Sequence, residues 1–134
     1  MTRGTVLFHN RFRFIDGDIG EKLLIILNTP QDNQPYLACK TTSRCKYLIT
    51  IEGCHSDKSI YHIKANKDGF HCDTWVQLNE IFEFTQAERL KAHLIDKVCA
   101  VTHCLSEPTI RAILNCIWKG DDASQYHLDL LFPS

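Results

Sequence analysis

Residues 23–27 read Leu23-Leu24-Ile25-Ile26-Leu27, the longest aliphatic run in this 134-residue chain. A membrane-spanning helix needs roughly 20 apolar residues, so this run is too short to cross a bilayer. Consecutive apolar residues put apolar side chains on both faces of a β-strand, which is typical of a central strand. Asn28-Thr29-Pro30 ends the run, because proline cannot continue a paired central strand. The sequence therefore predicts a strand in the middle of a sheet.

Short apolar or alternating runs lie on both sides of this strand, and turn residues separate them. In the first of them Phe12 and Phe14 alternate with Arg11 and Arg13, so the rings and the guanidinium groups face opposite sides. The remaining runs predict strands at residues 36–40, 47–51, 59–63, 74–78, 81–84 and 98–103. This pattern indicates a mainly β (α+β) fold.

Two helices are expected in the last third of the chain. Thr85-Gln86-Ala87-Glu88 has the spacing of a capping box and predicts a short helix to about residue 96. Ser106-Glu107-Pro108 predicts the start of a C-terminal helix, with serine as N-cap and proline in the first turn. Its apolar residues have helical spacing, at positions 110, 113, 114 and 117.

The chain length fits a single domain of residues 1–134, with residues 120–134 as a C-terminal extension. Leu128, Leu130, Leu131 and Phe132 make this extension apolar, so we expect it to pack on the domain or on a second copy. With 44% hydrophobic and 23% charged residues, the composition excludes a disordered chain, a collagen and a coiled-coil rod.

Charge is divided unevenly although the net charge is −1. Residues 1–67 contain ten Lys/Arg against six Asp/Glu, whereas residues 68–134 contain five against ten. A surface for RNA or phosphate is therefore expected in the first half.

Seven cysteines without a Cys-x-x-Cys pair predict reduced thiols in a reducing compartment, because a complete disulfide framework would leave one thiol over. The opening Met1-Thr2-Arg3-Gly4 has no apolar signal segment. We therefore expect a cytoplasmic protein that has no membrane segment.

Adjacent cysteine and histidine residues raise the alternative of a zinc site. The four ligands of a tetrahedral zinc ion are available by number from Cys45, Cys54, His62 and Cys72. No pair of them has the tight sequence spacing of a zinc knuckle. Neighbouring side chains on a strand point to opposite faces, so an adjacent pair supplies one ligand more easily than two. The prediction is no metal and no cofactor.

The order of elements and several short motifs resemble the MazF/PemK family of toxin endoribonucleases. The resemblance covers nearly all of the chain up to Lys119. The motifs that carry it are Arg3-Gly4 before the first strand, Lys22 at the entry to the second, Thr41-Thr42-Ser43 after a middle strand, the run at 75–81, and Leu105-Ser106 before the last helix.

This resemblance implies a small SH3-like β-barrel with a short helix and a C-terminal helix, which forms a homodimer. It implies a hydrolase of a toxin-antitoxin system that cleaves single-stranded RNA without a metal and that a cognate antitoxin protein restrains. Cleavage in the family proceeds by attack of the ribose 2′-hydroxyl and leaves a cyclic phosphate.

The chemistry of such a site needs cations at the phosphate and hydroxyls that orient it. Lys22, Thr42 and Ser43 are the predicted catalytic residues, in a cleft between residues 16–22 and 41–44. RNA binding is assigned to Arg44 and to three residues of the first strand region: Arg11, Arg13 and His9. His9 is also a candidate for proton transfer, because a histidine side chain titrates near neutral pH.

The chain departs from the family in two places. Lys22 stands where the family has arginine followed by proline, and lysine is a point charge rather than a bidentate fork. Gln77 and Asn79 stand where arginine and aspartate are frequent, and neither ionises. The alternative is a catalytically impaired barrel that binds RNA or a protein.

Four aromatic residues are candidates for stacking on bases, although core packing is the more common role of aromatic residues: Tyr36, Tyr47, Trp75 and Trp118.

Overall fold

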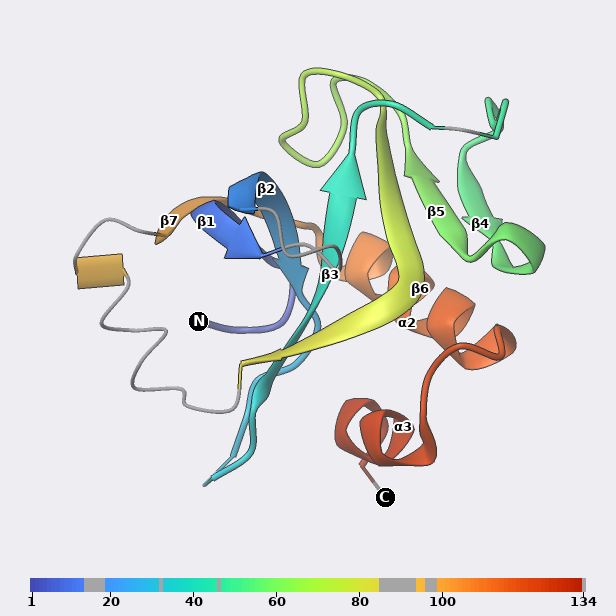
Figure 1. The fold of residues 1–134 in the computed structure, drawn as a ribbon. Coiled ribbons are helices and arrows are strands. Elements are labelled where there is room, and N and C mark those ends of the chain that lie inside the picture. Colours follow the sequence, from blue (N-terminus) through green and yellow to red (C-terminus); the bar gives the residue numbers. More distant parts are fainter. Residues whose placement is uncertain (14–18, 32, 46, 85–93, 96–98, 134) are drawn as a thin grey trace.

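A computed structural model describes residues 1–13, 19–31, 33–45, 47–84, 94–95 and 99–133, and for residues 11–13 and 19 it describes the backbone only. Seven antiparallel strands form one sheet in the order β4-β5-β6-β3-β2-β1-β7 (Figure 1). Their bounds are β1 Thr5–Arg13, β2 Ile19–Ile26, β3 Tyr36–Thr42, β4 Gly53–His55, β5 Ile60–Ile63, β6 Thr74–Phe84 and β7 Cys99–Cys104. The mainly β prediction is confirmed.

The sheet is open among the described residues. Its edges are β4 and β7, which do not pair with each other, so the described strands do not close into the expected barrel. Strand β6 is continuous where the sequence predicted two runs, and Figure 1 shows it curving along its length. Strand β6 pairs with β3 at residues 75–77 and again at residues 82–84, with a register irregularity between the two stretches, and only its first part, residues 74–77, also pairs with β5. The sheet is therefore strongly curved but not cylindrical.

The predicted central strand is confirmed, since β2 lies between β1 and β3. Ile25 and Leu27 contribute to one core cluster, whereas Leu24 and Ile26 contribute to the cluster on the opposite face. All four side chains are at most 1% exposed. The alternation explains why an uninterrupted aliphatic run was needed here: both faces of β2 are buried.

Helix α2, Glu107–Lys119, covers one face of the sheet with the predicted apolar stripe, and its buried residues include Ile110, Ile113 and Leu114. Ser106 precedes the helix as predicted, but the hydroxyl of Ser106 makes no capping bond to the backbone. Asp68 instead accepts hydrogen bonds from the Ser106 backbone N–H (2.9 Å) and the Thr109 hydroxyl (2.7 Å). Burial acts to raise the pKa of Asp68, but these bonds outweigh it and lower the pKa.

The apolar C-terminal residues pack on the same core. Helix α3, Gln125–Leu131, begins at Ser124, whose hydroxyl accepts from the His127 backbone N–H. Leu131 is buried, and Leu128, Leu130 and Phe132 pack against the core cluster that contains the apolar residues of α2. The expectation that the extension packs on the domain is therefore confirmed. No helix in the described part of the chain has the length and apolarity needed to span a bilayer.

Two further predictions concern a strand at residues 47–51 and a helix at residues 85–96. The predicted strand at 47–51 is wrong, because these residues form an irregular loop in which Leu48 is 99% exposed. The loop carbonyls accept side-chain hydrogen bonds: Ile49 O from Trp75 Nε1 and Ile51 O from a ring nitrogen of His62. The predicted helix at 85–96 lies outside the described residues except for 94–95, which are helical.

The prediction that all cysteines are reduced is also wrong. Cys54 on β4 and Cys116 on α2 form a disulfide, with their Cα atoms 5.6 Å apart. The local sequence around each cysteine does not indicate its partner, because 62 positions separate the two residues. The other five cysteines are free, and burial raises the pKa of the Cys39 thiol to about 12 and that of Cys99 to about 11.

Gly69 is expected to be essential for the turn between β5 and β6. Its φ of +81° disfavours any side chain, and a Cβ there would overlap the His103 ring. Gly69→Ala should lower the free energy of unfolding by about 3 kcal/mol, the sum of left-handed strain and overpacking. Gly53→Ala is the matched control, because Gly53 has φ +110° and no described residue lies within 4 Å of an added Cβ. Urea unfolding should show the smaller loss for Gly53→Ala, and equal losses would contradict the His103 clash.

Candidate functional site

Most of the predicted site residues meet in one groove at the ends of β2 and β3. We call it the β2–β3 groove; its volume is about 450 Å³, and it is lined by Phe8, Glu21, Lys22, Leu23, Thr41, Thr42, Ser43, Arg44, Phe70, His71, Cys72 and Thr74. The four residues expected from the sequence at a phosphate site are therefore neighbours in space. Residues 16–18 of the predicted cleft lie outside the described residues.

Lys22 is held in the groove by a hydrogen bond to the adjacent strand. Its ammonium donates to the Thr41 carbonyl oxygen at 3.0 Å. Burial lowers the pKa of Lys22 below its ordinary value, and the positive charge of Lys40 lowers it further. The groove thus holds a partly desolvated cation whose proton is more easily lost than that of a surface lysine.

The two predicted hydroxyls differ in their hydrogen bonds. The Thr42 hydroxyl donates to the Arg44 carbonyl oxygen (3.0 Å) and accepts from the Arg44 N–H (3.1 Å), so it fixes the turn after β3. A hydroxyl has only one proton to donate, and Thr42 has given its proton to the backbone. Ser43 is exposed and makes no hydrogen bond that the structure records within the described residues. Ser43 is therefore the better placed donor for a phosphate oxygen.

Among the described side chains of β1, that of His9 does not line this groove. His9 pairs with Lys22 across the β1–β2 ladder, but it is only 7% exposed and its ring stacks on Phe84 with centroids 6.3 Å apart. The buried ring packs against its neighbours and leaves little surface for contact with RNA. The backbones of Arg11 and Arg13 belong to β1, while their side chains lie outside the described part.

Sequence reasoning missed two ionisable groups of the β2–β3 groove. Glu21 precedes Lys22, and His71 comes from the loop between β5 and β6; both are exposed. A carboxylate and an imidazole are groups that accept or donate protons in general acid–base catalysis. His71 stood out in the sequence only as a neighbour of Cys72, and nothing in the local pattern indicated that its loop reaches the end of β3.

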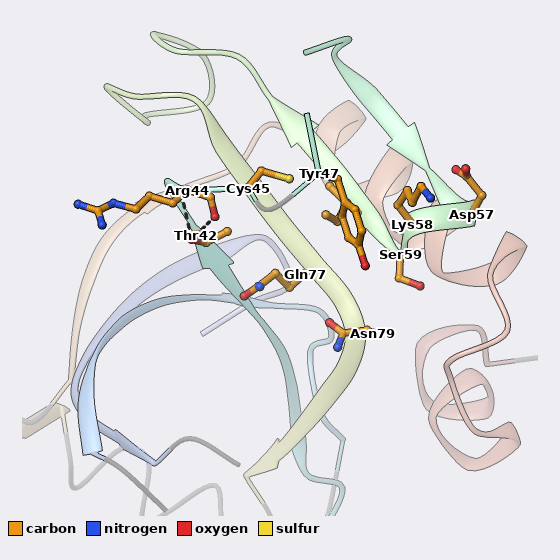
Figure 2. A pocket seen from close by; sticks show the side chains of 10 residues that line it. Thr42, Arg44, Cys45, Tyr47, Asp57, Lys58, Ser59, Gln77 and Asn79 are labelled. Carbon is orange, nitrogen blue, oxygen red and sulfur yellow. Dashed lines mark hydrogen bonds between the residues drawn. The ribbon is translucent and has the colours of Figure 1, made fainter. Parts of the chain in front are cut away.

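A second pocket adjoins the groove and shares Thr42 and Arg44 with it. We call it the Tyr47 pocket; it has a volume of about 380 Å³ and is lined by Thr42, Arg44, Cys45, Tyr47, Asp57, Lys58, Ser59, Ile60, Gln77 and Asn79. Figure 2 shows the Tyr47 ring between Lys58 on one side and the two amides of β6 on the other. The guanidinium of Arg44 extends away from this pocket (Figure 2).

The residues of the zinc alternative do not form a ligand set. Cys54 is bonded to Cys116. The His62 ring is completely buried, stacks on Trp75 and lies 3.3 Å from the Asp73 carboxylate. Within the described ranges, no three His, Cys, Asp or Glu side chains are close enough to hold a metal ion.

No protein-family model matches the sequence, and no curated protein matches it. The function is therefore inferred from the chemistry of the two adjoining pockets.

Proposed function

We propose that this protein is an endoribonuclease that cleaves single-stranded RNA without a metal, and that it is a divergent toxin of the MazF/PemK kind. The observation that carries the proposal is the meeting of Lys22 with Ser43 and Arg44 in the β2–β3 groove. Two cations and a hydroxyl donor in one groove form a suitable site for a phosphodiester.

The groove also offers the proton transfers that cleavage needs. Attack of the ribose 2′-hydroxyl on the phosphorus forms a cyclic phosphate and breaks the bond to the 5′ oxygen of the next nucleotide. One group must take the 2′-hydroxyl proton and another must protonate the leaving oxygen. Glu21 and His71 are the ionisable groups suited to these steps, while Lys22 stabilises the negative charge that develops on the phosphorane oxygens.

The pH dependence of cleavage should report the ionisation of Lys22. The cation is the active form, and burial lowers its pKa, so activity should fall as the pH rises through a value below that of an ordinary lysine. In Lys22→Arg this alkaline fall should disappear, because arginine stays charged. Initial cleavage rates across the alkaline range would measure it, and the same alkaline limb in Lys22→Arg would assign the fall to another group.

The remaining features of a toxin-antitoxin ribonuclease are part of the same proposal. They are an SH3-like architecture for the curved sheet, a homodimer, a cytoplasmic location, and a cognate antitoxin protein that restrains the enzyme. The basic first half of the sequence supports RNA as the substrate, because phosphate contacts supply most of the non-specific affinity for nucleic acid.

Incubation with long single-stranded RNA in the presence of EDTA tests the activity. The proposal expects discrete fragments from the wild-type protein on a denaturing gel and intact RNA with Lys22→Met. Wild-type protein that leaves the RNA intact, or fragments that are unchanged with Lys22→Met, would contradict it.

A second candidate function is binding without cleavage. Gln77 and Asn79 favour it, because they face the Tyr47 pocket and cannot transfer protons by ionising. Induced expression in bacteria separates the two functions: an active ribonuclease should arrest growth in the wild type but not as Lys22→Met, whereas a binding module should give the same growth with both.

A further inference from the structure

We propose that the Tyr47 pocket holds one unpaired nucleobase and that the Gln77 amide recognises its hydrogen-bonding edge. This inference rests on the proposed ribonuclease function and adds a base subsite to it. Because the pocket shares Thr42 and Arg44 with the β2–β3 groove, a strand whose phosphate lies in the groove can place a neighbouring base in the pocket.

Tyr47 supplies an aromatic wall for the base. Its side chain is 36% exposed, and the Lys58 ammonium lies 5.3 Å from the centroid of the ring. Figure 2 places Lys58 on the side of the ring away from Gln77 and Asn79, so the cation and a bound base would use different sides. Unpaired bases are commonly bound by stacking on such rings.

Gln77 supplies the polar floor. It pairs with Lys40 on β3 and with Ile60 on β5, so it sits in the interior of the sheet, and Asn79 lies two residues along on the same face. The Oε1 atom of Gln77 is buried and has no hydrogen-bond partner within the part of the chain that the structure describes. An unsatisfied buried acceptor is unusual in a folded protein, so this oxygen is available to a donor from a ligand.

A nucleobase can provide that donor. The terminal torsion of a glutamine is soft, so the amide can turn to present its oxygen and its NH₂ group side by side. Each base has a donor next to an acceptor on one edge, and glutamine or asparagine amides pair with such edges.

The four nucleoside 5′-monophosphates are the probes for a direct binding test. Each is titrated into ¹⁵N-labelled full-length protein, and the side-chain amide signals of Gln77 and Asn79 are followed. At least one nucleotide should shift both signals, and Gln77→Leu should weaken its binding at least tenfold. Tyr47→Leu is a second variant that removes the stacking wall at an exposed position. Gln125→Leu, the same change on the exposed face of α3, should bind like the wild type.

The outcomes separate this inference from the ribonuclease proposal. If none of the four nucleotides shifts the two amides, or if Gln77→Leu binds as tightly as the wild type, the base subsite is wrong even when the wild type cleaves RNA. If a nucleotide binds through Gln77 but RNA stays intact, the subsite stands and the ribonuclease proposal fails. If both hold, Gln77→Leu should also alter the sequence at which RNA is cut.

Discussion

Replacing Lys22 with methionine is expected to slow RNA cleavage at least a hundredfold. Methionine keeps the length and much of the apolar stem of the side chain, so the fold should survive, but the cation that faces the phosphate is lost. Removal of one preorganised electrostatic donor at a developing charge typically costs about 10²–10³ in rate. Initial rates on a single-stranded oligonucleotide measure the effect, and Lys22→Arg should retain part of the activity because the charge remains.

Lys64→Met is the matched control for this change. Lys64 is exposed and lines neither of the two pockets. The control should cleave RNA at the wild-type rate. Equal losses in both variants would mean that Lys22 acts through general charge rather than at the phosphate, and no loss in either would remove the β2–β3 groove from catalysis.

Opening the disulfide between Cys54 and Cys116 is expected to cause the largest loss of stability. The bond joins the edge strand β4 to α2 across 62 positions of the chain. Chain-entropy estimates for loops of this length give about 4 kcal/mol of stabilisation. Cys54→Ser should lower the free energy of unfolding by about that amount in urea, whereas Cys72→Ser, which removes an exposed free thiol, should leave stability nearly unchanged. A loss no larger in Cys54→Ser than in Cys72→Ser would contradict the stabilising role of the disulfide.

Counting thiols checks that the bond exists. Alkylation of the unfolded protein should add five groups without reductant and seven after reduction, as read by mass spectrometry. Seven groups without reductant would show that the protein is isolated with the bond open. Disulfides are rare in reducing compartments, so a cytoplasmic protein would function largely without this stabilisation.

Elements with strong local signals were predicted well. The aliphatic run at 23–27 requires burial on both faces and therefore a central strand, and the stripe of Ile110, Ile113 and Leu114 requires a helix with one buried face. The loop at 47–51 was misassigned because its apolar residues suggest a strand, whereas side-chain bonds from Trp75 and His62 to its carbonyls hold it without strand pairing.

The candidate site was only partly predictable. Lys22 and residues 42–44 were predicted from the resemblance and from the cations and hydroxyls beside predicted strands, and the structure places them in one groove. His71 and the Tyr47 pocket depend on how distant loops fold over the end of β3, which a local pattern does not encode. The disulfide depends in the same way on the packing of β4 against α2.

The chemical nature of the RNA ends tests the central claim most directly. Attack by the ribose 2′-hydroxyl predicts fragments from the wild-type protein in EDTA that carry a 2′,3′-cyclic phosphate at one end and a 5′-hydroxyl at the other, as read by mass spectrometry. Fragments with a 3′-hydroxyl and a 5′-phosphate, or no fragments at all, would contradict metal-independent cleavage at the β2–β3 groove.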